Sequence, residues 1–547
     1  MRTFTLALIT IAAGCGNNSA DDVASLPDLP SSPDMTMSAP DMWTPGDPLL
    51  VNTDKGAVQG MSAGAARLFL GIPYAAPPIG PLRWKPPQPA AAWTTPRDGS
   101  IKGATAMTAP CTQFDVFGNF NPMSSEDCLY VNVWAPLPVT SKAPVMVFIH
   151  GGGFTSGSGG DPTYDGTHLA STQGVVVVTM NYRLGPLGFL GHSGLAAEDT
   201  THPWAGNYGL EDQRAALQWV QTNAAAFGGD PANVTIFGES AGGFSVCFHM
   251  LSPASKGLFA RAIVESGSCA IPVPDAAAGN AQATRLATAL GCSGSDSAQL
   301  TCMRGKSAKD VVSILPLKPE ILFGAGEQWS PIAEGHDVPG QPIALLKSGT
   351  FTKVPLLIGT NHDEGAIFFL FGGKISTDAQ YKTALEQTYT TAGGDSIYAK
   401  YPSASFASPQ KALETVIADA TFVCPARRLA RASAAATQPT FRYEFERAPT
   451  TMVGNLGSTH SMELPFVFGN VYIGFDPTVD PNDKLVANAM QAAWAKFAAS
   501  GSPSVTGGFT WPAYDTMSET YAILDAPLST GTKLHNDVCD YWDTLTP

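Results

Sequence analysis

Short runs of apolar and β-branched residues recur along the chain, separated by longer segments of mixed polarity. The runs lie at 129–135, 144–150, 175–182, 234–238, 262–267 and 354–360. Runs of this length with little alternation are typical of strands that are buried on both faces of a parallel sheet. The pattern therefore predicts an α/β fold with a large, mostly parallel central sheet.

Helical spacing between these runs predicts helices that pack on the sheet. Five apolar residues between the third and fourth runs share this spacing: Leu210, Leu217, Val220, Ala224 and Phe227. A crossover helix between parallel strands has this pattern. A second helix is expected to start at Ser240. A third covers 484–501, where Gly501 and the following Pro503 are typical end signals.

The first 48 residues do not share this pattern. Residues 1–15 combine one positive charge with an apolar stretch and small residues ending at Cys15, which is typical of a secretory signal too short to span a bilayer. The ending resembles a bacterial lipobox, in which Cys15 becomes the lipidated first residue; an ordinary cleaved signal is the alternative. Residues 16–48 are rich in Pro, Asp, Ser and Met without Lys or Arg, and we expect a disordered tether. The folded domain is expected at 49–547.

Composition and charge exclude some partners. The chain has 547 residues, 44% hydrophobic and 14% charged, so it can bury a large core. Its net charge of −15 and the lack of Lys/Arg-rich runs argue against nucleic acid as a partner. Membrane contact is expected only through the N-terminal lipid anchor, and the oligomeric state is left open. Scattered His and Cys without zinc-ligand spacing predict no metal, and no organic cofactor is expected.

A candidate nucleophile follows the apolar run at 234–238. Gly238 and Gly242 flank Ser240 in the pattern G-x-S-x-G, in which a strand turns sharply into a helix and exposes the serine oxygen. The helix N-terminus would place partial positive charge near an anion formed at this serine. In a chain this rich in Gly, Ala and Ser, one such motif can arise by chance, so other residues must decide.

A glycine-rich loop supplies the second element of this chemistry. The sequence His150-Gly-Gly-Gly-Phe154 begins at the last residue of the run at 144–150. Such a loop brings backbone NH donors close to a tetrahedral oxyanion, and three consecutive glycines are costly unless close backbone approach is needed. A flexible turn is the alternative. We assign the oxyanion donors to the NH groups of Gly152, Gly153 and Ala241.

These motifs and four longer stretches together resemble the type B carboxylesterase family, which includes cholinesterases and bacterial para-nitrobenzyl esterases. The stretches lie at 69–89, 126–134, 182–190 and 206–243, and the likeness extends from about residue 50 to the C-terminus. The resemblance implies an α/β-hydrolase fold with long insertions that form a gorge over the serine. It also implies hydrolysis of carboxylic esters.

The order serine, acid, histidine in this fold leaves five histidines as candidates for the base: His249, His336, His362, His460 and His535. Small residues surround His460, and its segment resembles the base loop of the family. The segment after the run at 354–360 resembles the acid loop, in which the family has a glutamate, matching Glu364. Its neighbour Asp363 is the competing carboxylate. We predict Ser240, Glu364 and His460 as the catalytic residues.

Further residues match positions that support or surround the site in this family. Glu239, Ser266 and Glu463 are expected to support it, although each fits an ordinary cap or loop as well. Ile367 and Phe368 follow the acid and are expected to line the substrate pocket with apolar groups.

Cysteine usage agrees with export. Without Cys15, eight cysteines remain, an even number that predicts disulfides in a chain with a signal segment. The resemblance implies three pairs: Cys111 with Cys128, Cys292 with Cys302, and Cys424 with Cys539. Cys247 and Cys269 are left over; we predict a fourth bridge between them, with buried thiols as the alternative.

The sequence therefore predicts an exported serine esterase, anchored by lipid in a bacterial cell envelope or secreted. Its substrates are expected to be small neutral esters, because the interval 111–128 contains no Trp or Tyr to hold a quaternary ammonium group and offers Phe114, Phe117 and Phe120 instead. A lipase-like enzyme and, since some family members have lost the triad, a binding module are the alternative functions.

Overall fold

The computed structural model describes residues 46–100, 109–115, 119–317, 326–370, 374–448, 456–470 and 480–545. The predictions for the signal segment, for Cys15, for almost all of the tether and for Phe117 lie outside these residues. None of the helices in the described part of the chain has the length and apolar character of a membrane span.

Eleven strands form the central sheet, in the order β14-β13-β12-β11-β10-β9-β7-β8-β6-β4-β3, and three short strands, β1, β2 and β5, form a second sheet. The strands of the central sheet are β3 Met61–Ala63, β4 Ala66–Pro73, β6 Tyr130–Pro136, β7 Ala143–Ile149, β8 Val176–Met180, β9 Gly229–Glu239, β10 Arg261–Glu265, β11 Leu356–Asn361, β12 Thr440–Phe445, β13 Thr520–Leu524 and β14 Ser529–Thr532. The others are β1 Leu50–Asn52, β2 Ala57–Gln59 and β5 Arg97–Asp98. Strands β8, β7 and β9 to β13 are parallel, whereas the pairs β3–β4, β4–β6, β6–β8 and β13–β14 are antiparallel. All six predicted strands are present, and the sheet is mostly parallel with antiparallel edges.

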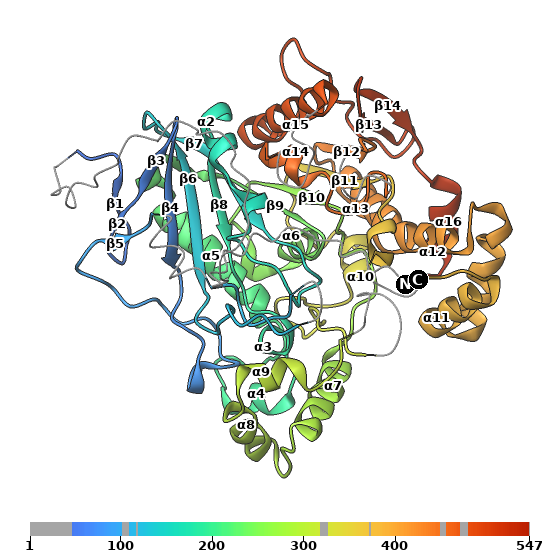
Figure 1. Ribbon diagram of the computed structural model, residues 1–547, viewed down its shortest axis with the longest axis horizontal. Helices are drawn as coiled ribbons and strands as arrows, with labels where there is room; N and C mark the ends of the chain where they lie inside the picture. The colour runs from blue at the N-terminus through green and yellow to red at the C-terminus, as the bar shows by residue number, and fades with distance from the viewer. Residues whose placement is uncertain are drawn as a thin grey trace, which may run out of the picture.

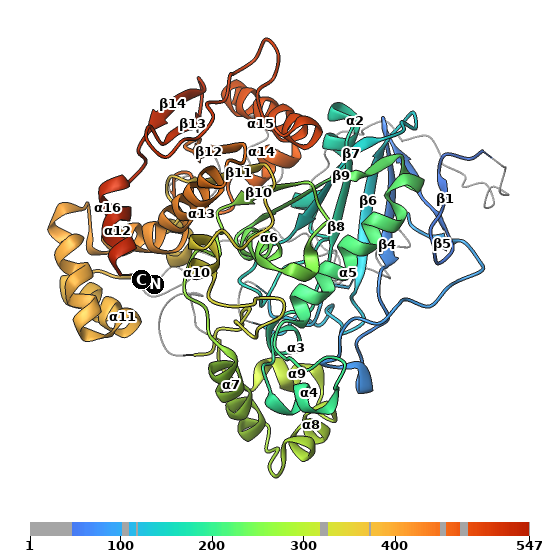
Figure 2. The same ribbon diagram turned by 180° about the vertical axis from the view of Figure 1, so that it is seen from behind.

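Helices cover both faces of this sheet (Figure 1). The α-helices of the described residues, both those on the sheet and those beyond it, are α2 Thr167–Gln173, α3 Gly185–Gly188, α4 Ser193–Glu198, α5 Tyr208–Asn223, α6 Ala241–Leu251, α7 Ala276–Ala289, α8 Asp296–Arg304, α9 Ala308–Ser313, α10 Pro342–Lys347, α11 Asp378–Lys400, α12 Pro409–Ile417, α13 Cys424–Ala435, α14 Leu464–Phe468, α15 Pro481–Ser500 and α16 Asn536–Thr544. The view from behind shows α5 in front of the strands (Figure 2). The predicted crossover helix is α5, although its last predicted positions, Ala224 and Phe227, lie in a 3₁₀ turn beyond it.

Alternating side chains on the strands fill two cores. Along β7, Val145, Val147 and Ile149 pack with residues of α5 and α6, whereas Met146 and Phe148 pack with residues of α2, α14 and α15. This alternation follows from the pleat of a strand, in which successive side chains point to opposite faces. Because both faces are covered, both sets of alternating positions on a strand such as β7 are apolar, which explains the apolar runs in the sequence.

The parallel strands deliver their carboxyl ends to one edge of the sheet. Glu239, Glu265 and Asn361 are the last residues of β9, β10 and β11, and β7 ends at Ile149 directly before the glycine-rich loop. Ligand sites of open α/β sheets lie at this edge. The fold therefore brings together residues that are far apart in the sequence.

Candidate active site

Ser240 occupies the sharp turn between β9 and α6. Its φ of 54° and ψ of −123° are unfavourable for a residue with a side chain, and its backbone NH is held at 3.0 Å from the carbonyl oxygen of Glu265. The helix begins at Ala241, one residue later than predicted, with Ser240 as its N-cap residue. The local backbone thus fixes the serine at the helix N-terminus.

The two flanking glycines are sterically necessary. A Cβ atom on Gly238 would lie 2.6 Å from the carbonyl group of Gly242, and a Cβ atom on Gly242 would overlap the carbonyl oxygen of Ile149. Both approaches leave no room for a side chain. The spacing of the motif is therefore explained by the packing of the turn against the end of β7.

The glycine-rich loop packs directly against this turn. A Cβ atom on Gly151 would lie 3.1 Å from Cβ of Ser240. Gly152 and Gly153 have φ values of 99° and 60°, in the region that favours glycine. Gly153, Ser240 and Ala241 line the same cavity. Backbone NH groups from the loop and from the start of α6 are thus available close to the serine.

Glu364 and His460 form a hydrogen-bonded pair beside the turn. His460 Nδ1 lies 2.6 Å from Oε2 of Glu364, and both side chains are buried. The backbone NH of Asn361 donates to Oε1 of Glu364 at 2.8 Å, which fixes the carboxylate. Asp363 instead accepts a hydrogen bond from Lys411 at 2.7 Å. The two neighbouring carboxylates therefore have different partners, and only Glu364 contacts His460.

The other ring nitrogen of His460 faces the residue before the serine. Its Nε2 lies 3.1 Å from Oε1 of Glu239, and it has no hydrogen-bond partner among the described residues. Ser461 donates to the same Glu239 oxygen at 2.6 Å. The substrate-free structure thus contains no hydrogen bond between Ser240 and His460, a bond that often tightens only when substrate is bound.

Two opposing effects set the charge state of His460. Burial lowers its pKa, but the negative charges of Glu239 and Glu364 and the hydrogen bond to Glu364 outweigh burial, so the pKa is raised above its ordinary value. Burial also raises the pKa of Glu239, against the opposing charge of His460. The carboxylates around the imidazole therefore favour its protonated form.

Two more buried carboxyl groups lie behind this pair. Glu463 accepts a hydrogen bond of 2.5 Å from Nδ2 of Asn361, the residue that also fixes Glu364. Glu265 accepts a hydrogen bond of 2.5 Å from Nε1 of Trp494, and burial raises its pKa to about 8. Burial, together with neighbouring carboxylates, raises the pKa of Glu463 well above its usual range. The side chain of Ser266, at a φ of 45°, is fully buried without a hydrogen-bond partner among the described residues.

The remaining candidate bases have other partners. His249 is buried between Ser255 and Gln213, and burial lowers its pKa to about 3. His535 pairs with Asp419 at 2.6 Å. The other two are His336, which stacks on Trp204, and His362, which is half exposed and lies 3.6 Å from Glu444. None of these contacts places a ring against Glu364.

A cavity of about 830 Å³ opens at Ser240. Phe368 lines it, whereas Ile367 is not among its described lining residues; the backbone NH of Ile367 donates to Oγ1 of Thr459. The ring of Phe422 also lines the cavity and packs on His460 with a centroid distance of 4.6 Å. Phe422 lies in the π-helical turn Ala418–Val423 between α12 and α13, an irregularity often found at functional sites.

Residues 47–542 match the model of the carboxylesterase family. The chain belongs to the carboxylesterase family. It is a carboxylic ester hydrolase of the serine type, and small-molecule esters are the substrates of this class. The mostly parallel sheet with flanking helices is the α/β-hydrolase fold that the sequence predicted.

Characterised relatives of this carboxylesterase agree with the match. Cholinesterase of Mus musculus is 35% identical over 540 residues, covering 91% of this chain and 87% of that protein. Acetylcholinesterase of Bungarus fasciatus is 33% identical over 535 residues, covering 91% and 86%. The solved structure of a PNB esterase superposes with a TM-score of 0.77 at 34% identity, covering 90% of this chain and 99% of the other.

Four disulfides tie the carboxylesterase domain together. They are Cys111–Cys128, Cys247–Cys269, Cys292–Cys302 and Cys424–Cys539. The second joins α6, which starts after the serine, to the loop that follows β10. Disulfides form and persist in oxidising compartments, so this number of bridges indicates an exported protein.

Among the described residues, one group of side chains that could hold a metal ion lies outside the Glu364–His460 pair. Donor atoms of Glu334, His336 and Asp337 lie within 4.8 Å of one another. Asp337 already pairs with Arg214, and the Glu334 carboxylate already accepts backbone hydrogen bonds from Asp337 and Val338. These contacts hold the loop in place, and we assign no metal to it.

Three residues that hold the candidate catalytic side chains were not predicted from the sequence. They are Asn361, which bridges Glu364 and Glu463; Ser461, which holds Glu239; and Phe422, which packs on His460. Asn361 directly follows the predicted strand at 354–360, and Ser461 directly follows the predicted base His460. These positions were a signal from which both residues could have been identified. Nothing in the sequence pointed to Phe422.

Proposed function

We propose that this esterase hydrolyses small, uncharged carboxylic esters through an acyl-enzyme on Ser240. His460 is the general base, and Glu364 orients it. One observation carries the proposal: the strained turn places Ser240 in the wall of a cavity that Gly153 and Ala241 also line, next to the buried Glu364–His460 pair. In that pair Nδ1 of His460 lies 2.6 Å from Oε2 of Glu364, and the other ring nitrogen faces Glu239, the residue before the serine. Nucleophile, base, orienting acid and oxyanion donors are the parts that acyl transfer needs.

The roles follow from this arrangement. His460 Nε2 takes the proton from Oγ of Ser240 as that oxygen attacks the ester carbonyl carbon, and the NH groups of Gly152, Gly153 and Ala241 bind the oxyanion. The imidazolium returns the proton to the departing alcohol, which leaves an acyl group on the serine. Water then attacks the acyl-enzyme, His460 takes its proton, and the carboxylic acid is released as the serine is restored.

The supporting residues act through His460 or through its partner. The negative charge of Glu239 next to Nε2 stabilises the imidazolium that forms during the reaction. Glu463 acts through Asn361, whose amide and backbone NH join it to Glu364. For Ser266 we propose a backbone role, because its NH donates to the carbonyl oxygen of Gly359 at 2.9 Å and joins β10 to β11.

The cavity wall supports uncharged substrates. Most of the described residues that line it are apolar or aromatic, including Phe244, Phe248 and Phe368. Two arginines, Arg285 and Arg428, also line it, and the carboxylate of Glu327 in the wall pairs with Arg285 at 2.7 Å. A quaternary ammonium group would meet this positive charge, and no other carboxylate among the described lining residues offsets it.

Aromatic faces suited to a cation are nevertheless present at another part of the wall. Tyr389 and Trp542 both line the cavity, although neither lies in the interval 111–128. Cation–π contacts with such rings contribute up to about 2 kcal/mol when water is excluded. The preference for neutral esters must therefore be measured against a cationic ester of equal reactivity.

The test compares butyrylcholine with its uncharged 3,3-dimethylbutyl analogue. We expect p-nitrophenyl butyrate to be hydrolysed efficiently and the uncharged analogue to have the higher kcat/KM of the matched pair. A tenfold or greater preference for the choline ester would refute the neutral-substrate proposal while leaving ester hydrolysis intact. Absence of hydrolysis for all three esters would contradict the esterase itself.

For the N-terminal segment we propose processing at Cys15 and attachment of lipid to its thiol, which would hold the exported domain at a membrane by the tether 16–48. The sequence pattern ending at Cys15 supports this proposal.

A further inference from the structure

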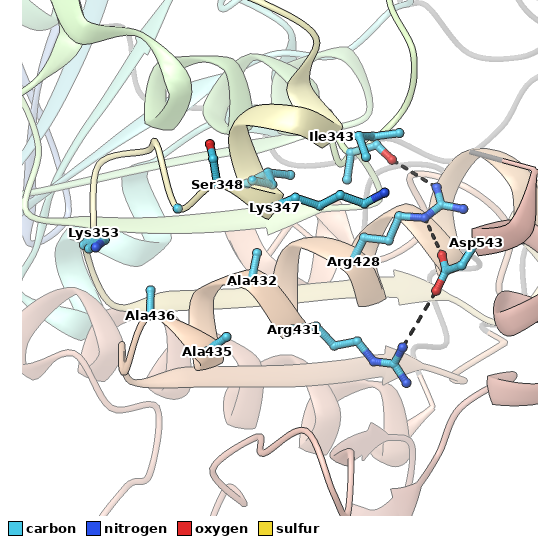
Figure 3. A pocket seen from close by; sticks show the side chains of 13 residues that line it. Ile343, Lys347, Ser348, Lys353, Arg428, Arg431, Ala432, Ala435, Ala436 and Asp543 are labelled. Carbon is cyan, nitrogen blue, oxygen red and sulfur yellow. Dashed lines mark hydrogen bonds and ion pairs between the residues drawn. The ribbon is translucent and has the colours of Figure 1, made fainter. Parts of the chain in front are cut away.

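A second cavity, of about 600 Å³, lies between α10, α13 and the end of α16 (Figure 3). Its volume falls within the roughly 300–1,000 Å³ of small-molecule sites. Ser240, Glu364 and His460 do not line it. One residue, Arg428, lines both this cavity and the one at Ser240. The second cavity is therefore a neighbour of the active site with a separate lining.

Four cationic side chains and one carboxylate are among the described residues of this second lining, in a chain whose net charge is −15. Arg428 and Arg431 lie at one end, next to that carboxylate, Asp543 (Figure 3). Arg428 Nε donates to Asp543 at 2.6 Å, and Arg431 pairs with Glu519 and lies 3.7 Å from Asp543. The arginines are thus held in place by carboxylates of the chain itself.

Two lysines supply positive charge that no carboxylate of the described ranges neutralises. Lys347 ends α10 and Lys353 lies in the segment before β11, and both side chains are exposed. Among the described residues, no carboxylate lies within 4.0 Å of either ammonium group. Figure 3 shows Lys347 extending over the cavity toward Arg428, with Lys353 at the far end from Asp543. An anion in the cavity would meet these ammonium groups.

An apolar floor lies between the two charged ends. Ala432, Ala435 and Ala436 line the cavity from α13, and Ile343 and Leu346 line it from α10. Ala432 and Ala435 follow Arg428 by four and seven residues, so a single face of α13 carries both the charge and the apolar groups. The small side chains of the alanines leave room for an aliphatic chain along this face.

We propose that this cavity binds an aliphatic carboxylate, with the head group at Lys347 beside Arg428 and the chain along the alanine face of α13 toward Lys353. A cationic or neutral amphiphile would leave the lysines without partners, and a bare inorganic anion would leave the apolar floor uncovered. The combination selects a ligand with one negative head and an apolar tail. The inference depends on the cavity alone and does not require that the proposed ester hydrolysis occurs.

Isothermal titration of the wild-type protein with sodium octanoate tests this site. We expect saturable binding that the double variant Lys347→Gln/Lys353→Gln weakens at least about tenfold, since the charge-assisted contact of the head group and the second ammonium group of the wall are both lost. The matched control Lys256→Gln/Lys496→Gln removes two exposed lysines outside the cavity and should bind as the wild type does. Arg428 is left unchanged because it lines both cavities.

A second variant separates this cavity from the active site, where octanoate can also bind as a product analogue. Ala435 is exposed on α13, so Ala435→Glu places a negative charge in the second cavity without disturbing the core, and it should weaken octanoate binding at least as strongly. Octyltrimethylammonium and inorganic phosphate should each bind at least about tenfold more weakly than octanoate. The proposal is overturned by equal octanoate affinity in wild type and both variants, by absence of saturable octanoate binding, or by phosphate binding as tight as octanoate binding.

Discussion

His460 lies between two carboxylates, and this position determines how its charge responds to pH. Burial lowers its pKa, but Glu239 and Glu364 together raise the pKa by more than burial lowers it, so the net shift is upward. Hydrolysis needs the neutral imidazole, which is lost as the pH falls through the pKa. We therefore expect kcat/KM for p-nitrophenyl butyrate to fall toward low pH, with a midpoint above the ordinary histidine pKa of about 6.5.

The same measurement on Glu239→Gln identifies the cause. Removal of the charge 3.1 Å from Nε2 should move the midpoint to lower pH, because Glu239 stabilises the protonated ring. A profile that is flat from pH 5 to 8 would argue against histidine as the base. An unchanged midpoint in the variant would argue against the contact with Glu239.

Glu364 and Asp363 provide a matched pair of neighbouring carboxylates. Glu364→Gln should lower kcat roughly 10³- to 10⁴-fold, because the amide no longer holds the productive tautomer of His460. Asp363→Asn removes only a partly exposed ion pair with Lys411, and such pairs contribute about 1 kcal/mol or less to stability, so kcat should stay near the wild-type value. Steady-state measurement of kcat for both variants shows which carboxylate orients His460. A larger loss of kcat for Asp363→Asn than for Glu364→Gln would reverse the assignment.

At this scale the sequence predicts the residues whose roles depend on local backbone. Ser240 and its flanking glycines could be identified because one turn imposes the whole motif. The supporting contacts could not be derived from spacing, since Asn361 reaches Glu463 across 102 residues and Trp494 reaches Glu265 across 229. Such pairs become neighbours only when the strand order is known.

The turn between β9 and α6 is the element on which the serine depends. Gly242→Ala would drive a Cβ atom into the carbonyl oxygen of Ile149, so α6 must shift away from β7. We expect a lower Tm by circular dichroism and a loss of p-nitrophenyl butyrate hydrolysis in the folded fraction. Gly340→Ala is the control, because the nearest atom to its added Cβ would be 3.9 Å away. Equal Tm and activity for the two variants would contradict the proposed packing of the turn.

Strands were predictable where both faces are apolar and less so elsewhere. All six predicted runs are strands, whereas β12, with the sequence TFRYEF, was not predicted because Arg442 and Glu444 interrupt its apolar pattern. Both side chains are nevertheless buried. The strands toward the two ends of the sheet, β3, β4, β13 and β14, were also not predicted. Strands β3, β13 and β14 are short, and Arg67, Gly71 and Pro73 interrupt the apolar pattern of β4.

In the molecule as a whole, helices that are distant in the sequence complete the cavity at Ser240. Tyr389 lies at a break within α11, and Trp542 lies on α16 near the end of the chain, yet both line the cavity that Gly153 also lines. The sequence predicted that a gorge exists only through the family resemblance. Its wall could not be predicted, because it depends on how separate helices are packed together.

The N-terminal proposal belongs to this scale as well. Cells that express the full chain should incorporate radioactive fatty acid into the protein, and Cys15→Ser should abolish the label, because the thiol of Cys15 is the proposed attachment point. The eight other cysteines are joined in disulfides and should not be labelled. Unlabelled wild-type protein would contradict the anchor and leave simple secretion.

The claim that Ser240 is the nucleophile is tested most directly by mapping a covalent adduct. The protein is treated with a fluorophosphonate ester, digested and analysed by mass spectrometry, with residual activity measured on the same sample. The account predicts one phosphonyl group on Ser240, loss of activity in proportion to labelling, and at least about a 10⁴-fold lower kcat in Ser240→Ala with the fold retained. An adduct on another residue, or activity of Ser240→Ala within tenfold of wild type, would contradict it.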